Sequence, residues 1–226
     1  MKKYTSSEHT REALINAAGE LAAEMGFPNV STRAVAERAS ENIGSIHYHF
    51  GGKEQLFEAV VREVIKRGRS LTIEQVIEPF SDKLSEPEWQ TEALRAMIQR
   101  EISILFDPKS PRWHTRVVYQ LMQYRNPMQE LLKTELINPF IEAIDRIVLA
   151  IRPDMHPRER FIVASLLYSP IISHADYMTI YLERLEDEYY TPDYLQHLED
   201  MIVHQTTLLL GIQAPQPQKN HTKPAP

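Results

Sequence analysis

The chain has 226 residues, of which 42% are hydrophobic and 25% are charged, and its formal net charge is −6. This composition excludes wholesale disorder, and the length suits a small domain joined to a larger one. The chain has only seven glycines and no cysteine. Low glycine content favours an all-helical fold, and the lack of cysteine excludes disulfides, thiolate metal sites and cysteine nucleophiles.

Charge is distributed unevenly along the chain. Residues 1–70 hold ten Lys/Arg and nine Asp/Glu, whereas residues 71–226 hold fifteen and twenty-two. We therefore expect any nucleic-acid surface in the first third. The start of the chain has no apolar run typical of a signal peptide, and the uncharged stretch 161–175 is shorter than the roughly 20 residues that span a bilayer. We expect a cytoplasmic protein without a membrane partner, which the absence of cysteine also suits.

The first predicted elements are short helices. Residues 1–9 are expected to be a flexible tail, and apolar residues at helical spacing predict a helix from Thr10. Ser31 and Asn42 are good N-caps for two further helices separated by a tight turn. A longer helix is expected to start at Lys53 and to join this small domain to the rest of the chain.

Later elements are also helical in pattern. Pro139 and Pro170 are expected to kink or split the helices they interrupt. Residues 213–226 are rich in proline and lack apolar periodicity, which predicts a disordered tail. The predicted organisation is a helix-turn-helix domain at 10–52, a connecting helix at 53–69, and an effector-binding and dimerisation domain at 70–212.

Two short helices joined by a tight turn predict a helix-turn-helix that binds DNA. On the second helix, Ile43, Ile46 and Phe50 are expected to face the core, which leaves the opposite flank for a DNA groove. Hydroxyl, imidazole and ammonium groups on this unit can bind phosphate, and the first turn of its first helix favours anions. The residues expected to contact DNA are Thr32, Arg33, Asn42, Ile43, Gly44, Ser45, His47, Tyr48, His49 and Lys53.

The helix-turn-helix segment also matches a known sequence motif. Residues 31–39 (STRAVAERA) and 42–56 (NIGSIHYHFGGKEQL) strongly resemble the DNA-binding domain of TetR-family transcriptional regulators, over about residues 10–65. Ser40 and Glu41 depart from the family's usual glycine and small apolar residue at the turn, and His47 stands where a phosphate-binding tyrosine is common. The Asn-Ile-x-x-Ile opening and the C-terminal layout are most similar to the CecR-like branch. Without the motif, a simple packing module with a solvated basic face would be the preferred interpretation.

Two late segments carry apolar residues at spacings of three and four, which suits helices that pair with a second copy of the chain. The same pattern would also suit a core within one chain. The resemblance implies dimerisation through the last two long helices, and it favours the interface. The residues expected at the interface are Phe161, Ala164, Tyr168, Ile171, Leu198, Ile202, Gln205 and Leu209.

The intervening helices, around 89–106, 111–125 and 127–150, carry aromatic and hydrogen-bonding residues on shared faces. Such groups among apolar walls are typical of a small-molecule site, although the polar residues could equally be solvated. The resemblance implies an effector pocket in this domain but does not name its ligand. The residues expected to line it are Met97, Arg100, Trp113, Arg116, Gln120, Gln123 and Phe140.

Catalytic and metal-binding motifs are not evident. His197, Asp200 and His204 lie on one helix face, but three such residues are more often an interface hydrogen-bond set than a metal site. We expect no enzyme activity, cofactor or metal. The hypothesis is a nucleoid-associated homodimeric repressor that binds palindromic double-stranded operator DNA and is released by a small-molecule effector. The alternative is an interaction protein that uses the same helix-turn-helix as an effector-independent DNA tether.

Overall fold

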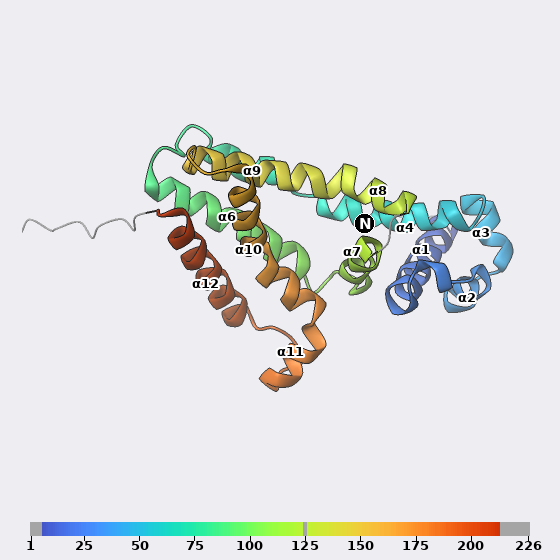
Figure 1. The fold of residues 1–226 in the computed structure, drawn as a ribbon. Coiled ribbons are helices and arrows are strands. Elements are labelled where there is room, and N and C mark those ends of the chain that lie inside the picture. Colours follow the sequence, from blue (N-terminus) through green and yellow to red (C-terminus); the bar gives the residue numbers. More distant parts are fainter. Residues whose placement is uncertain (1–5, 124–125, 213–226) are drawn as a thin grey trace, which may run out of the picture.

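The computed structural model describes residues 6–123 and 126–212, and within these ranges every regular element is helical. The all-helical prediction is confirmed. Figure 1 shows an elongated arrangement with the first three helices at one end and the last helices toward the other. The predicted tail at 213–226, and residues 1–5 of the predicted N-terminal tail, lie outside the described residues.

The N-terminal unit consists of α1 (Ser6–Met25), a 3₁₀ turn (Phe27–Asn29), α2 (Thr32–Arg38) and α3 (Ile43–Phe50), followed by the long helix α4 (Lys53–Gly68). Helix α1 begins four residues before the expected start at Thr10, so residues 6–9 are helical rather than part of a tail. The apolar pattern does not extend to these residues. Glu8 lies in the first turn, where a negative charge interacts favourably with the helix dipole.

The remaining elements follow in the order α5 (Ile73–Ile77), a 3₁₀ turn (Glu78–Phe80), α6 (Pro87–Leu105), α7 (Trp113–Gln123), α8 (Pro127–Leu132), a π-helical segment (Lys133–Ile137), α9 (Asn138–Ile151), α10 (Pro157–Asp176), α11 (Met178–Leu185) and α12 (Pro192–Leu210). The π-helical segment directly precedes Pro139, which sits in the first turn of α9, as expected for an interrupted helix. Pro170, in contrast, lies inside α10, which continues through it.

The first hydrophobic core joins the N-terminal helices to α7 and α8. Leu14, Leu21 and Val60 are buried together with Trp113 and Val117 of α7. Helices α1 and α7 approach closely, since a Cβ atom built on Gly19 of α1 would lie 2.5 Å from the Trp113 ring. The core therefore crosses the expected domain boundary at residue 70, with α7 packed directly on α1.

The second core fills the space between α5, α6, α9, α10 and α12. A polar contact fixes α12 on α6: the buried Glu199 accepts hydrogen bonds from Arg95 at 2.6 Å and from Gln99 at 3.0 Å. Helices α9 and α10 are likewise joined by Arg160 and Asp145 at 2.7 Å. Within the described ranges, no helix is long and apolar enough to cross a membrane.

Candidate nucleic-acid interface and ligand cavity

Side-chain caps start both helices of the helix-turn-helix. The Ser31 hydroxyl accepts a hydrogen bond from the Ala34 backbone N–H at 3.1 Å. The side-chain amide oxygen of Asn42 accepts one from the Gly44 backbone N–H at 2.8 Å. Both residues therefore satisfy backbone donors that helix starts leave unpaired, as the sequence predicted. Because the Asn42 oxygen is engaged in the cap, it is less available to DNA than expected.

The turn between α2 and α3 has a left-handed residue. Ser40 has a φ of 56°, a conformation that glycine adopts more easily than other residues. The neighbouring Glu41 accepts a hydrogen bond from the Thr10 hydroxyl of α1 at 2.9 Å. This contact attaches the turn to α1, so Glu41 stabilises the unit by a polar contact rather than by apolar packing.

Replacing Ser40 by glycine should raise the free energy of unfolding by about 0.5–1 kcal/mol, because glycine relieves the left-handed strain at some cost in chain entropy. The matched control is Ser45→Gly inside α3, which should lower stability by about 1 kcal/mol through lost helix propensity. Urea denaturation measures both changes. A Ser40→Gly variant as destabilised as Ser45→Gly would show that the turn is not strained.

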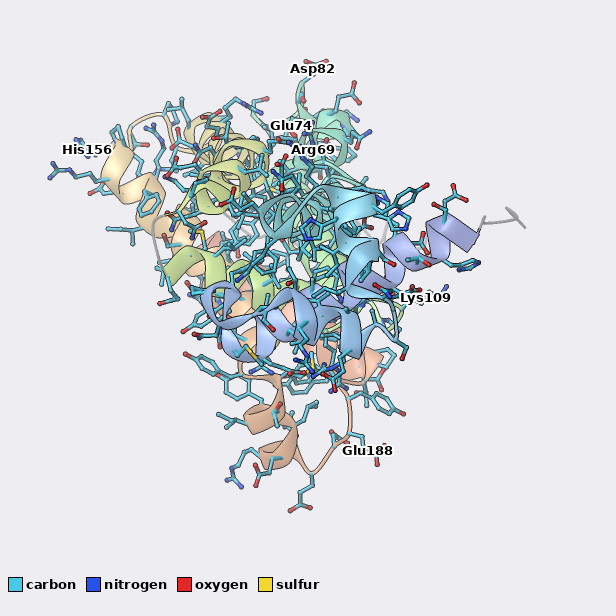
Figure 2. All side chains as sticks on the ribbon, turned by 90° about the vertical axis from the view of Figure 1, so that its right-hand side faces the viewer. Arg69, Glu74, Asp82, Lys109, His156 and Glu188 are labelled. Carbon is cyan, nitrogen blue, oxygen red and sulfur yellow. The ribbon has the colours of Figure 1, made fainter. Side chains whose placement is uncertain are left out.

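Helix α3 is seated on the core through its middle and its C-terminal turn. Ile46 is fully buried and Phe50 packs against the first core, whereas Tyr48 is 81% exposed. Ile43 was expected to face the core, but it is 48% exposed because it lies in the first turn, beyond the edge of the core. The flank opposite Ile46 is open to solvent, and viewed from this end of the molecule no other element lies in front of it (Figure 2).

The residues predicted to contact DNA all keep some exposure. Six of them are exposed, namely Arg33, Asn42, Ile43, Gly44, His47 and Tyr48. The other four are half-buried, namely Thr32, Ser45, His49 and Lys53. The Lys53 ammonium lies 5.3 Å from the centre of the Phe57 ring, at the start of α4 beside the end of α3. The surface thus combines a groove-sized helix with flanking donors for phosphate.

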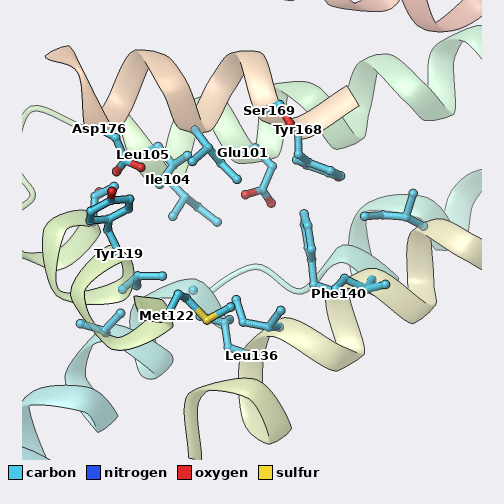
Figure 3. Close-up of a pocket in the computed structure, with 18 of the residues that line it drawn as sticks. Glu101, Ile104, Leu105, Tyr119, Met122, Leu136, Phe140, Tyr168, Ser169 and Asp176 are labelled. Carbon is cyan, nitrogen blue, oxygen red and sulfur yellow. The ribbon is translucent and has the colours of Figure 1, made fainter. Parts of the chain in front are cut away.

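A cavity of about 540 Å³ opens between α4, α6, α7, α9 and α10 (Figure 3). Its walls are largely apolar, with Phe140 and Leu136 on one side and Ile104 and Leu105 on another. Arg100 and Phe140 line it, as predicted. This size and this apolar character are typical of small-molecule sites.

Arg100 connects the cavity wall to the end of α4. Its side chain is buried, donates hydrogen bonds to the backbone oxygens of Leu71 at 2.7 Å and of Gly68, and pairs with Glu101. The guanidinium carbon lies 5.8 Å from the centre of the Phe140 ring. Burial lowers the pKa of Arg100. Each of its three side-chain nitrogens thus donates a hydrogen bond within the protein.

Two polar groups of the cavity lining have no partner among the described residues. They are the Tyr168 hydroxyl and Nδ1 of His114, both of which are buried. Burial raises the pKa of the Tyr168 hydroxyl, which therefore stays protonated and can donate. Burial also lowers the pKa of His114 to about 4, so its ring is neutral near neutral pH. Unpaired buried polar groups are costly, and a ligand that bonded to them would remove the cost.

Residues 14–60 match the model of the family "Bacterial regulatory proteins, tetR family". The HTH-type transcriptional repressor AcnR of Corynebacterium glutamicum is 26% identical over 149 residues, which cover 60% of this chain and 78% of AcnR. Several further curated regulators match over shorter stretches, between 29% and 58% of their own length. The N-terminal unit of this chain is therefore similar to that of TetR-family transcriptional regulators.

Solved structures extend the similarity from the N-terminal unit to the whole fold. NalD, the secondary repressor of the MexAB-OprM multidrug efflux pump in Pseudomonas aeruginosa, is 24% identical, with a TM-score of 0.56 over 88% of this chain and 96% of NalD. AibR in complex with isovaleryl coenzyme A and operator DNA is 15% identical, with a TM-score of 0.58 over 87% of this chain and 97% of AibR. At these identities the similarity establishes the fold.

The other predicted pocket residues lie outside the cavity lining. Met97 is buried in the second core, Trp113 packs on Gly19 in the first, and Arg116 and Gln123 are exposed outside the cavity. Gln120 lies near Gly26. The prediction chose the wrong face of α7, because Trp113 and its neighbours are drawn into the core with α1. The face that lines the cavity carries His114, Thr115, Val118, Tyr119 and Met122, and its aromatic and apolar spacing was the pattern that sequence reasoning missed.

The predicted interface residues are also placed differently. Phe161, Ala164 and Tyr168 line the cavity, and Phe161 is also 57% exposed, so it stays available to an interface. Ile171 and Ile202 are buried in the chain's own core, and Leu198 packs against it, so these three contribute to intrachain packing. Gln205 and Leu209 are exposed, as an interface requires. The exposed apolar residues that the prediction missed are Ile162, Leu166, Met201 and Leu208. They lie on α10 and α12 at positions close to the residues that were predicted to form the interface.

Proposed function

We propose that this chain is a repressor that binds palindromic operator DNA as a homodimer and is released when a small molecule occupies its cavity. It acts in the cytoplasm, at the bacterial nucleoid. The observation that carries this proposal is the open flank of α3 beside the capped start of α2. Three similar proteins support it: AcnR and NalD are described as repressors, and AibR was solved in complex with a ligand and operator DNA. The Asn42-Ile43-x-x-Ile46 opening of α3 supports a place near the CecR-like branch.

The DNA contacts divide into two groups by their chemistry. Tyr48 and Lys53 present a hydroxyl and an ammonium group at the C-terminal end of α3, where they bind phosphate oxygens and orient the domain. Ser45 and His47 lie on the groove-facing flank and read base edges. One α3 covers a half-site, and two held about 34–36 Å apart read a palindrome across one helical turn.

Replacing Tyr48 or Lys53 by alanine should weaken binding to all DNA by about tenfold, and Lys53→Ala should reduce the salt slope by about one. Ser45→Ala and His47→Ala should instead relax the preference at single base pairs, by about 1–3 kcal/mol each. Fluorescence anisotropy on fragments selected from the genome and on random DNA measures these effects. Lys83→Ala is the matched control, since Lys83 lies over Trp89 at the opposite end of the molecule. Identical effects from all four DNA-face variants would contradict the division.

An exposed apolar surface on α10 and α12 supports dimerisation. Ile162 and Leu166 of α10 are 55% and 40% exposed, and Met201 and Leu208 of α12 are 68% and 67% exposed. Helices α10 and α12 pack against each other, and both lie in the half of the molecule away from α3 (Figure 1). We name these four residues the α10–α12 face, and we propose that it pairs with its copy in a second chain.

Helix α4 supports coupling between the cavity and the DNA surface. It runs from Lys53, beside α3, to Gly68, whose backbone oxygen is held by Arg100 of the cavity wall. Leu136 of the cavity lining also packs on Gly68. A ligand that moves either residue shifts one end of a helix about 24 Å long. A coupling of about 2.7 kcal/mol suffices to change operator affinity about a hundredfold.

A further inference from the structure

One carboxylate of the cavity lining, that of Asp176, is more available to a ligand than the guanidinium groups of the lining. Figure 3 shows Glu101 and Asp176 among the residues that line the cavity, with the Glu101 carboxylate directed toward its centre. Arg67 also lines it, but its guanidinium pairs with Asp107 at 2.8 Å and donates to the backbone oxygen of Ile104. Arg100 is occupied by two backbone oxygens and Glu101. A negatively charged ligand would therefore have to compete with Asp107 and Glu101 for these two positive charges.

Asp176 is the charged group of the lining that has no hydrogen bond or ion pair with any described residue. It ends α10 and is half-buried. Burial raises the pKa of its carboxyl group, and the opposing influence of Arg116 comes from a residue outside the lining. A carboxylate that is partly removed from water and left unpaired is a costly group that a ligand cation would stabilise.

The surroundings of Asp176 suit a cation with a large apolar body. Tyr119 lies on the same side of the cavity (Figure 3), and aromatic faces attract cations. On the opposite side of the cavity in this view, Phe140 and Tyr168 pack edge to face with ring centres 4.4 Å apart. The buried Tyr168 hydroxyl, 6% exposed as a residue, lacks a partner and can bond to a polar atom of the ligand.

Resting on the proposed function, we propose that the effector is a lipophilic organic cation whose ammonium group binds Asp176 and whose apolar body fills the cavity. The apolar walls supply most of the contact area, and the unpaired carboxylate selects the charge. The positive charges of the two arginines of the lining are already paired with Asp107 and Glu101, whereas the charge of Asp176 is not paired, so the lining favours a cation over an acid. The occupant therefore differs in charge from a fatty acid or another carboxylate of similar size.

The test compares three ten-carbon probes: decyltrimethylammonium, decanoate and 1-decanol, each below the concentration at which it aggregates. Isothermal titration calorimetry on the full chain should give an affinity for the cation at least about tenfold higher than for decanoate. Asp176→Asn should lower the affinity for the cation about tenfold and leave that for decanol unchanged. Asp187→Asn is the matched control, since Asp187 is exposed on the loop after α11 and outside the cavity lining.

Decanoate binding as tightly as the cation would overturn the proposal, as would binding of none of the three probes or an Asp176→Asn variant with unchanged cation affinity. Unchanged decanol binding to Asp176→Asn shows that the variant is folded. Operator release by each probe, followed by anisotropy, separates this proposal from the proposed function. Release by decanoate alone would refute the charge assignment and leave the repressor account intact. Absence of specific DNA binding would refute the repressor account, while the calorimetry would still report the charge preference.

Discussion

Replacing Leu166 by aspartate should convert the dimer to a monomer and lower the affinity for palindromic operator at least about a thousandfold, which corresponds to about 4.1 kcal/mol. Leu166 is a 40% exposed member of the α10–α12 face. Pairing of this face with its copy would bury the new carboxylates without a partner, which costs several kcal/mol. A monomer also offers one α3, which reads a single half-site.

Sedimentation velocity measures the first effect and anisotropy with the selected operator measures the second. Leu185→Asp is the matched control, because Leu185 is 39% exposed on α11, outside the proposed interface. It should leave both the dimer and the operator affinity intact. If Leu166→Asp sediments like the unmodified protein, the interface lies elsewhere.

Arg100→Met should lower the free energy of unfolding by about 2–3 kcal/mol, because it leaves the largely buried Glu101 without its partner. The backbone oxygens of Gly68 and Leu71 also lose their donor. With the end of α4 released from the cavity wall, a bound effector should no longer change the operator affinity. Urea denaturation measures the stability. Anisotropy with whichever ten-carbon probe releases the unmodified protein measures the coupling.

Two variants separate the loss of coupling from the loss of stability. Arg100→Met combined with Glu101→Gln removes the residual charge, so it should regain part of the stability without regaining the coupling. Arg95→Met changes an arginine of the same helix, which pairs with Glu199 and Asp200 of α12 rather than with α4. It should be destabilised and still respond to the effector. Loss of the response in Arg95→Met as well would mean that general destabilisation, rather than the Arg100 contact, abolishes coupling.

The N-terminal unit could be predicted well because its structure depends on local interactions. The caps at Ser31 and Asn42 involve donors two or three residues away, and their residue types alone favour helix starts. Ile43 shows the limit of this reasoning, since helical spacing places it with Ile46 but not at the same depth in the core. The contact between Glu41 and Thr10 joins distant parts of the chain and could not be predicted from spacing.

The cavity could be predicted only in part, because its lining depends on how whole helices are rotated. The close approach of Gly19 and Trp113 turns α7 so that Tyr119 and Met122, rather than Arg116 and Gln120, line the cavity. On α10, residues whose spacing suggested an interface, such as Tyr168, instead line the cavity. Amphipathic patterns show that a face is used, but not which neighbour it contacts.

Titration of the full-length protein with a selected palindromic fragment, and with a scrambled fragment of equal composition, tests the central claim that α3 reads operator DNA. The account predicts that at physiological salt the palindrome binds at least about 10³-fold more tightly, with two chains on each duplex. Equal affinities for the two fragments, or binding by one chain per palindrome, would contradict it.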